Sequence, residues 1–184
     1  PGPSLWPGRA GRTPQSLSMF SFLSKGPTRR RTLVFASATH VWSDLFYALL
    51  IPLLPLMRPD LGLSYTQVGL LRSVFSGASA ALQIPAGFLA ERVGEFWLLI
   101  GGNIWVAAGL VGMALVPSFL FLLAITLVSG LGGGTQHPLA TSMVSRAYDE
   151  RGRSTAIGIV NFSGDLGKMA APALALLLAL RYGW

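Results

Sequence analysis

The sequence predicts an all-α membrane protein with five membrane-spanning helices. Apolar residues make up 52% of the 184 residues and charged residues only 11%, which leaves too little polar surface to cover a water-soluble domain. Apolar runs of roughly 20 to 26 residues recur along the chain, and at about 1.5 Å per residue each can cross a ~30 Å hydrocarbon layer. Because every backbone amide in lipid needs a hydrogen-bond partner, these runs are expected to be helices.

A basic segment precedes the predicted helices. Residues 1–32 are rich in Pro, Gly, Ser and Arg and contain no acidic residue, so we expect a disordered cytosolic tail. The same composition is also typical of an organellar transit peptide. The spans are expected at 33–57, 65–90, 97–116, 119–143 and 155–180.

Basic residues fall mainly on one side of the predicted membrane. The tail carries six of them, and the connections at 91–96 and 144–154 carry Arg92, Arg146, Arg151 and Arg153. The connections at 58–64 and 117–118 and the end of the last span carry only Arg58 and Arg181. This bias predicts a cytosolic amino terminus in a bacterial inner membrane.

Composition also limits the partners. The net charge of +7 lies in the tail and in short connections, so a lipid bilayer and no nucleic acid is the expected partner. The chain has no cysteine and two histidines, so neither a cofactor nor a metal is expected.

Polar side chains repeat at helical spacing in four of the five predicted spans, which places them on one face of each helix. The third span, 97–116, has no ionisable residue and Asn103 as its only strong polar group. Ionisable groups in a membrane usually face protein or water. We therefore expect the other four spans to face a shared aqueous pathway for solute and protons. Its expected residues are His40, Asp44, Tyr47, Arg72, Gln83, His137, Asn161, Asp165 and Lys168.

A purely structural role is the alternative. Lys168 lies three residues after Asp165 on one helix and can neutralise it, and Asp44 can form a lock with Arg72 across helices. The two histidines can hydrogen-bond to helix backbone.

The connection between the second and third spans carries a recognisable motif. A glycine, an acidic and basic pair and a second glycine follow one another as Gly87, Glu91, Arg92 and Gly94. This spacing resembles the cytosolic signature of the major facilitator superfamily, and Arg151 and Arg153 before the fifth span resemble a second basic element of that family. Residues 63–69 and 136–138 are similar to its fosmidomycin-resistance branch. Two departures are Glu95 and Phe96, which stand where the family usually has basic residues.

The resemblance implies a secondary transporter of twelve helices in two halves, with a site between the halves. It implies that the first, second, fourth and fifth helices line the cavity and that the motif residues form a cytosolic gate. The chain would then be an amino-terminal half without its sixth helix, and its partner would be the missing carboxyl half.

The expected function is alternating-access transport of a small, anionic or drug-like solute, and no enzymatic activity. Asp44 or Asp165 would carry a proton, and Arg72 and Lys168 would attract an anion. One alternative is a truncated membrane protein or accessory subunit that does not transport. Another, a metalloenzyme built on His40, Asp44 and His137, has only two imidazoles and one carboxylate as ligands.

Overall fold

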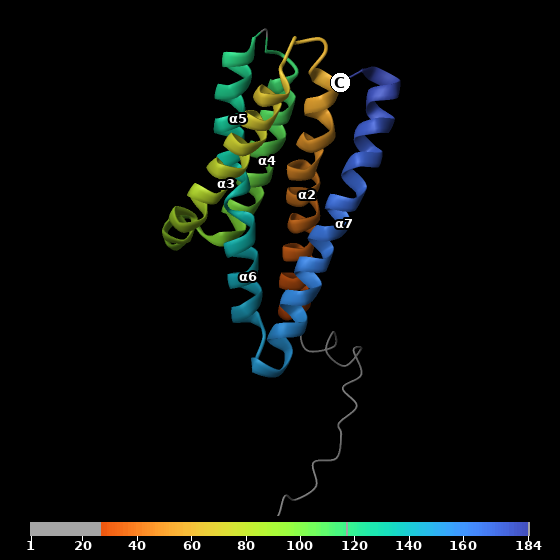
Figure 1. The fold of residues 1–184 in the computed structure, drawn as a ribbon. Helices are drawn as coiled ribbons and strands as arrows, with labels where there is room; N and C mark the ends of the chain where they lie inside the picture. Colours follow the sequence, from red (N-terminus) through yellow and green to blue (C-terminus); the bar gives the residue numbers. More distant parts are fainter. Residues whose placement is uncertain (1–26, 117, 184) are drawn as a thin grey trace, which may run out of the picture.

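The computed structural model describes residues 27–116 and 118–183, and these form an elongated bundle of helices (Figure 1). The helices are α2 (Pro27–Met57), α3 (Tyr65–Val93), α4 (Glu95–Met113), α5 (Phe119–Gly133), α6 (Gln136–Ala147) and α7 (Glu150–Tyr182). In Figure 1, α2 and α7 run side by side, and the last turns of α3 and α7 bend away from the rest.

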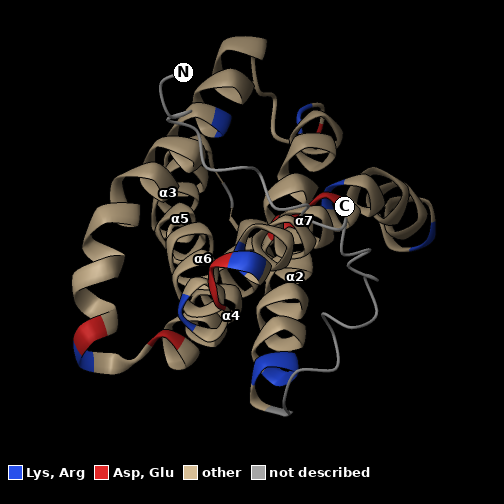
Figure 2. Ribbon diagram, turned by 90° about the horizontal axis from the view of Figure 1, so that it is seen from below, with Lys and Arg blue, Asp and Glu red and all other residues tan. Residues whose placement is uncertain are grey.

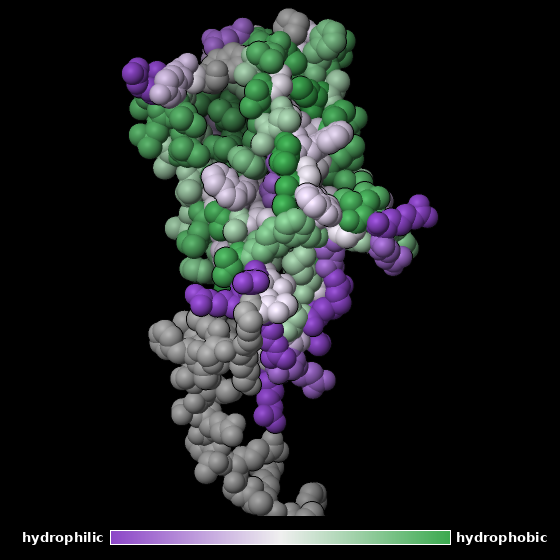
Figure 3. Space-filling view, turned by 180° about the vertical axis from the view of Figure 1, so that it is seen from behind, coloured by the Kyte–Doolittle hydropathy of each residue, from purple (hydrophilic) through white to green (hydrophobic). Residues whose placement is uncertain are grey.

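Five helical stretches are long and apolar enough to cross a membrane by length and composition, with α5 and α6 forming one stretch, Phe119–Ala147. Most of the face seen in Figure 3 is covered by apolar side chains, and hydrophilic side chains gather at its lower end. This distribution suits contact with hydrocarbon rather than water. The predicted all-α membrane fold with five spans is therefore confirmed.

The two largest apolar clusters of the core lie at opposite ends of α2, and a small third one joins Leu45 and Ala48 of α2 to Ala171 of α7. One includes Leu33 and Ala36 of α2 and packs them against α4, α6 and α7. The other includes Leu50 and Leu54 of α2 and packs them against α3, α4 and α5. The stretch of α2 between the two clusters contains buried polar residues, among them His40 and Asp44.

Two glycines allow α7 to lie directly against α2. A Cβ atom at Gly164 would lie 2.8 Å from the imidazole ring of His40, and one at Gly167 would lie 3.0 Å from the backbone nitrogen of Leu45. Neither distance is compatible with a side chain unless the helices separate. This close approach brings the polar face of α7 to the middle of α2.

The glycines between 130 and 134 allow close packing of the fourth span against α3 and α4. A Cβ at Gly130 would lie 2.9 Å from Ala78 of α3, and one at Gly134 would lie 2.8 Å from Leu82 of α3. A Cβ at Gly132 would meet the backbone of Gly102 on α4 at 2.9 Å. In contrast, a Cβ at Gly77 of α3 would meet no heavy atom within 4 Å.

The disordered tail expected over residues 1–32 overlaps the beginning of α2. Among the described residues the first helix, α2, begins at Pro27 instead of residue 33, and residues 1–26 lie outside the part of the chain that the structure describes. Proline suits the first turn of a helix because its fixed φ is already helical. Arg29 also forms an ion pair with Asp149 at 3.4 Å, and its carbonyl accepts a hydrogen bond from the Tyr148 hydroxyl, so this turn is held in place.

The other helix bounds differ at their ends. The fourth span, expected as one helix over 119–143, is interrupted at Gly134 and Thr135 and continues as α6 to Ala147. Successive glycines weaken the helix there, and the Thr135 hydroxyl donates to the carbonyl of Gly132. The second span extends to Val93, and Gly94, with φ of +89°, connects it directly to α4. That conformation favours glycine.

Candidate functional site: a charged cluster between α2, α6 and α7

The carboxylate of Asp44 is the centre of a cluster of ionisable groups. Asp44 is 2% exposed and lies on α2, one helical turn after His40, whose Nε2 is 3.4 Å from Asp44 Oδ2. Nζ of Lys168 on α7 lies 3.0 Å from the same oxygen, and Nε2 of His137 on α6 lies 3.9 Å from Oδ1. Three helices therefore supply the groups around one buried acid.

Lys168 connects this buried acid to an exposed one. Its ammonium also donates a hydrogen bond to Asp165 Oδ1, at 3.1 Å and one turn earlier on α7. The side chains of Lys168 and Asp165 are 47% and 62% exposed, whereas that of Asp44 is 3% exposed. The structural alternative expected Lys168 to pair with Asp165. This pair is present, but Lys168 also pairs with Asp44 and so lies between two acids. Figure 2 shows both charge signs beside α7 and α2 within an otherwise largely uncharged bundle.

The two histidines contact each other. Their ring centroids are 4.9 Å apart at 75°, an edge-to-face arrangement. His40 is 2% exposed, and neither of its ring nitrogens has a hydrogen-bond partner of normal geometry. His137 is exposed on α6, next to the interruption of the fourth span. Imidazole and carboxylate groups at these distances can hold a proton and pass it between them.

The same groups have the donor types of a metal site. One ligand atom from each of His40, Asp44 and His137 lies within 4.8 Å of the other two. However, the Lys168 ammonium is already 3.0 Å from Asp44 Oδ2 and supplies positive charge there. The geometry therefore supports a proton-binding site that contains the Lys168 side chain more directly than it supports a bound metal ion.

A second polar group lies further along α2. The guanidinium carbon of Arg72 on α3 is 5.1 Å from the centre of the Tyr47 ring, and the Tyr47 hydroxyl donates to Ser76 Oγ at 2.7 Å. The lock between Asp44 and Arg72, which the structural alternative proposed, is not formed, because Lys168 is the cation that pairs with Asp44. Arg72 instead packs on an aromatic face, which attracts a cation.

The remaining pathway residues stay apart from these two groups. Gln83 on α3 and Asn161 on α7 are exposed, and within the described residues neither hydrogen-bonds to the cluster. In contrast, sequence reasoning missed a buried contact in which Gln136 Nε2 donates to Thr39 Oγ1 at 3.3 Å. Asn103 of α4 donates to the Thr39 carbonyl at 3.2 Å, so the third span also contacts α2 through its one strong polar group.

The motif residues Gly87, Glu91 and Arg92 are exposed at the end of α3. Glu95, which departs from the family pattern, forms an ion pair with Arg146 at the end of α6, and Phe96 stacks on Phe35 of α2 with centroids 4.7 Å apart. Both departing residues therefore have partners of their own.

The basic element before the last span lies near these contacts. Arg153 Nε donates to the Ser145 carbonyl at 3.1 Å, and Arg151 is exposed at the start of α7. The hydrogen bond joins the first turn of α7 to α6.

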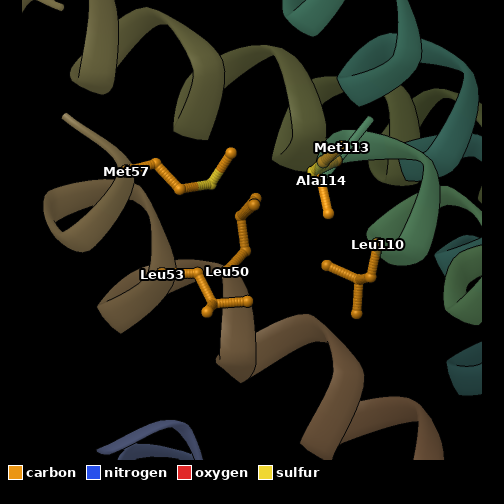
Figure 4. A pocket seen from close by; sticks show the side chains of 6 residues that line it. All are labelled: Leu50, Leu53, Met57, Leu110, Met113 and Ala114. Atoms are coloured by element: carbon orange, nitrogen blue, oxygen red, sulfur yellow. The ribbon is translucent and has the colours of Figure 1, made fainter. Parts of the chain in front are cut away.

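An apolar pocket lies between α2 and α4 (Figure 4). It is lined by Leu50, Leu53, Met57, Leu110, Met113 and Ala114. The lining side chains have no polar group with which to orient a charged solute, so we assign the pocket to helix packing.

These features define a class of protein: a helical integral membrane protein that gathers charged side chains inside its bundle, as transport proteins do. The chain belongs to the Major Facilitator Superfamily, since the sequence model of that family matches residues 36–184.

Several curated proteins are similar to this chain. The fosmidomycin resistance protein of Escherichia coli K12 is 29% identical over 147 residues, which are 80% of this chain and 36% of that protein. A probable sulfoacetate transporter of Cupriavidus necator is 34% identical over 132 residues, 71% of this chain and 30% of that protein. A probable L-galactonate transporter of Escherichia coli K12 is 25% identical and aligns with 96% of this chain and 41% of its own length. The chain thus spans between 30% and 41% of the length of these relatives.

Proposed function

We propose that the protein is a secondary transporter that moves a small organic anion together with a proton by alternating access. The observation that carries this proposal is the position of Lys168, whose ammonium lies between buried Asp44 and exposed Asp165. While both acids are ionised, the two carboxylates and the ammonium carry a net charge of −1, which repels an anion. A proton bound at Asp44 removes this negative charge and releases Lys168 from its buried partner, so an anion can replace the exposed Asp165 at the ammonium.

This arrangement couples the two ligands. The proton favours anion binding because it releases Lys168, and by linkage the anion favours proton binding to the same degree. His40 and His137 lie against Asp44 and provide the route by which a proton reaches the buried carboxylate. His137 is the exposed member of this route and is therefore its entrance.

The names of the relatives agree with an anionic solute. Sulfoacetate and L-galactonate are anions at neutral pH, and another similar protein is named a hexuronate transporter. A rice protein that is 31% identical over 136 residues is named a probable anion transporter. These names describe the relatives, and they support the same chemical class for this chain.

The test is uptake into proteoliposomes that contain the complete gene product. Radiolabelled organic acids are offered with and without an inward proton gradient. We expect the gradient to accelerate anion uptake, Lys168→Gln to abolish uptake, and Asp44→Asn to remove the acceleration. Asp60→Asn, in the connection between α2 and α3, is the control and should leave coupling unchanged.

The contrary outcomes are equally definite. If Asp44→Asn keeps the full response to the gradient, Asp44 is not the proton carrier. If the wild-type protein takes up no solute in any condition, the result supports the alternative of a non-transporting membrane protein or accessory subunit.

The proposed orientation places the amino terminus in the cytosol of a bacterium, as the positive charges indicate. Exposed Glu91, Arg92 and Arg151 would then form the cytosolic gate with another part of the transporter. These 184 residues contain no cysteine, so single cysteines introduced here can report the orientation once any cysteine elsewhere in the gene product is replaced. An impermeant maleimide should label Asp60→Cys in intact cells and should not label Glu150→Cys. The reverse pattern would contradict this orientation.

A further inference from the structure

Arg72 provides a second cation along the polar face of α2. Its guanidinium carbon lies 5.1 Å from the ring centre of Tyr47, which follows Asp44 by three residues on α2. Three residues of helix correspond to about 4.5 Å along the axis. Lys168 contacts α2 at Asp44, so two positive groups, one from α7 and one from α3, flank α2 at successive turns.

The two cations differ in what neutralises them. Lys168 has Asp44 and Asp165 within 3.1 Å, whereas no carboxylate among the described residues forms an ion pair with Arg72. Nη1 of Arg72 is buried and has no hydrogen-bond partner. The Tyr47 hydroxyl donates a hydrogen bond to Ser76 Oγ, away from Arg72. The contact of Tyr47 with the Arg72 guanidinium is therefore a cation–π contact with the ring face.

An unpaired guanidinium inside a membrane bundle needs an acceptor. A guanidinium offers five N–H donors in a planar fork, and its strongest partners are planar or tetrahedral oxyanions. Burial of a charge without a partner is costly, so the group is stable only if water or a ligand supplies oxygen atoms. The charge and position of Arg72 therefore fit an acid group of the transported solute.

We infer that the solute carries two acid groups, one bound at Lys168 and the other at Arg72. This inference rests on the proposed function, in which an anion binds at Lys168. Both cations contact α2 within about one helical turn, so they suit a small solute whose two acid groups can reach both of them. Small dicarboxylates and sulfocarboxylates belong to that chemical class.

Arg72 then determines specificity by rejecting monoanions. When the site closes around a monoanion at Lys168, Arg72 loses water and gains no acid group in its place. A site whose buried polar group is left unpaired discriminates strongly against the ligand that lacks the partner. A charge-assisted hydrogen bond corresponds to about a 10- to 100-fold difference in affinity.

The experiment is competition for uptake by the complete gene product in proteoliposomes. Malonate, succinate and sulfoacetate are compared with acetate and propionate as competitors, and each is titrated against a labelled dianion. The variants are Arg72→Gln, Arg72→Lys and the control Arg58→Gln. Arg58 is a suitable control because its guanidinium also packs on a tyrosine ring, 4.0 Å from the centre of Tyr65, but it lies beyond the end of α2.

We expect dianions to compete at concentrations at least about 10-fold lower than monoanions in the wild-type protein. Arg72→Gln should remove this preference by weakening dianion binding while monoanion binding stays within about 2-fold, and Arg72→Lys should restore part of it. Arg58→Gln should behave as the wild type.

Other outcomes separate the inference from the proposed function. Equal competition by monoanions and dianions in the wild type would overturn the two-acid inference and leave anion transport standing. This comparison needs no variant, so it decides the matter even if Arg72→Gln fails to fold. Uptake of no anion by the wild-type protein would overturn both.

Discussion

The Lys168 ammonium on α7 lies 3.0 Å from the Asp44 carboxylate on α2, and this contact joins two helices whose backbones touch through glycine. Asp44 is almost fully buried and Lys168 is about half exposed, so the pair is asymmetric. The buried Asp44 carboxylate depends strongly on the Lys168 ammonium for its stability. The ammonium depends less on Asp44, because it is also exposed to solvent and pairs with Asp165.

This asymmetry predicts the effect of Lys168→Gln. The change leaves the buried Asp44 without its cation and should lower stability by about 1–3 kcal/mol. Adding Asp44→Asn removes the uncompensated acid, so the double variant should be more stable than Lys168→Gln alone. Thermal unfolding of the purified proteins in detergent measures both. A double variant no more stable than the single variant would show that the two residues do not interact.

The close contact of α7 with α2 predicts that even a small side chain at Gly164 or Gly167 lowers the stability of the fold. Gly164→Ala or Gly167→Ala should separate α7 from α2 and lower stability by about 1–3 kcal/mol, because the added methyl meets an imidazole ring or backbone atoms. Gly158→Ala is the matched control. Its added methyl meets no atom within 4 Å, and alanine favours helix, so stability should stay the same or rise by up to about 1 kcal/mol. Equal effects at all three positions would contradict close packing.

The ion pair between Glu95 and Arg146 is expected to contribute little to stability. Its side chains are 12% and 65% exposed, so water screens much of the attraction. Glu95→Gln should lower stability by less than about 1 kcal/mol. The pair should nevertheless be specific: Glu95→Arg with Arg146→Glu should restore what Glu95→Arg alone loses, as measured by the amount of folded protein in membranes. Failure of the swapped pair to recover would argue against direct contact.

Tyr148 lies outside the spans, and we expect its phenol to make the stability of the fold depend on pH in the alkaline range. Burial raises the pKa of its phenol, while Arg29 nearby acts in the opposite direction to a smaller extent. A phenol whose pKa is higher in the folded state binds its proton more tightly there. Its contribution is therefore complete below the unfolded pKa of about 10 and is lost as pH rises above that value. Melting temperatures from pH 8 to 11 should fall less steeply for Tyr148→Phe; identical slopes would contradict this.

Helical spacing in the sequence was sufficient to place His40, Asp44 and Tyr47 on one face of α2 and Asp165 and Lys168 on one face of α7. It was not sufficient to pair faces with one another. Periodicity fixes the direction of a side chain about its own helix, whereas the choice between Lys168 and Arg72 as partner of Asp44 depends on which helix comes closest. In this bundle α7 does, because Gly164 and Gly167 have no side chains.

The interruption of the fourth span was hidden for a related reason. Residues 119–143 read as one apolar run, and hydropathy does not register a local change in hydrogen bonding. Glycine weakens a helix wherever it lies, but packing of Gly130 and Gly134 against α3 determines how the run is held. The contact of Gln136 with Thr39 was missed because it joins residues far apart in the chain.

Gly94 is the only residue between α3 and α4, and its positive φ completes the reversal of the chain. Consequently this junction offers no slack for an inserted tag, a reporter domain or a protease site, and any insertion must unwind helix on one side. Residues 58–64, which connect α2 to α3 without a helix, are the better place to attach a probe.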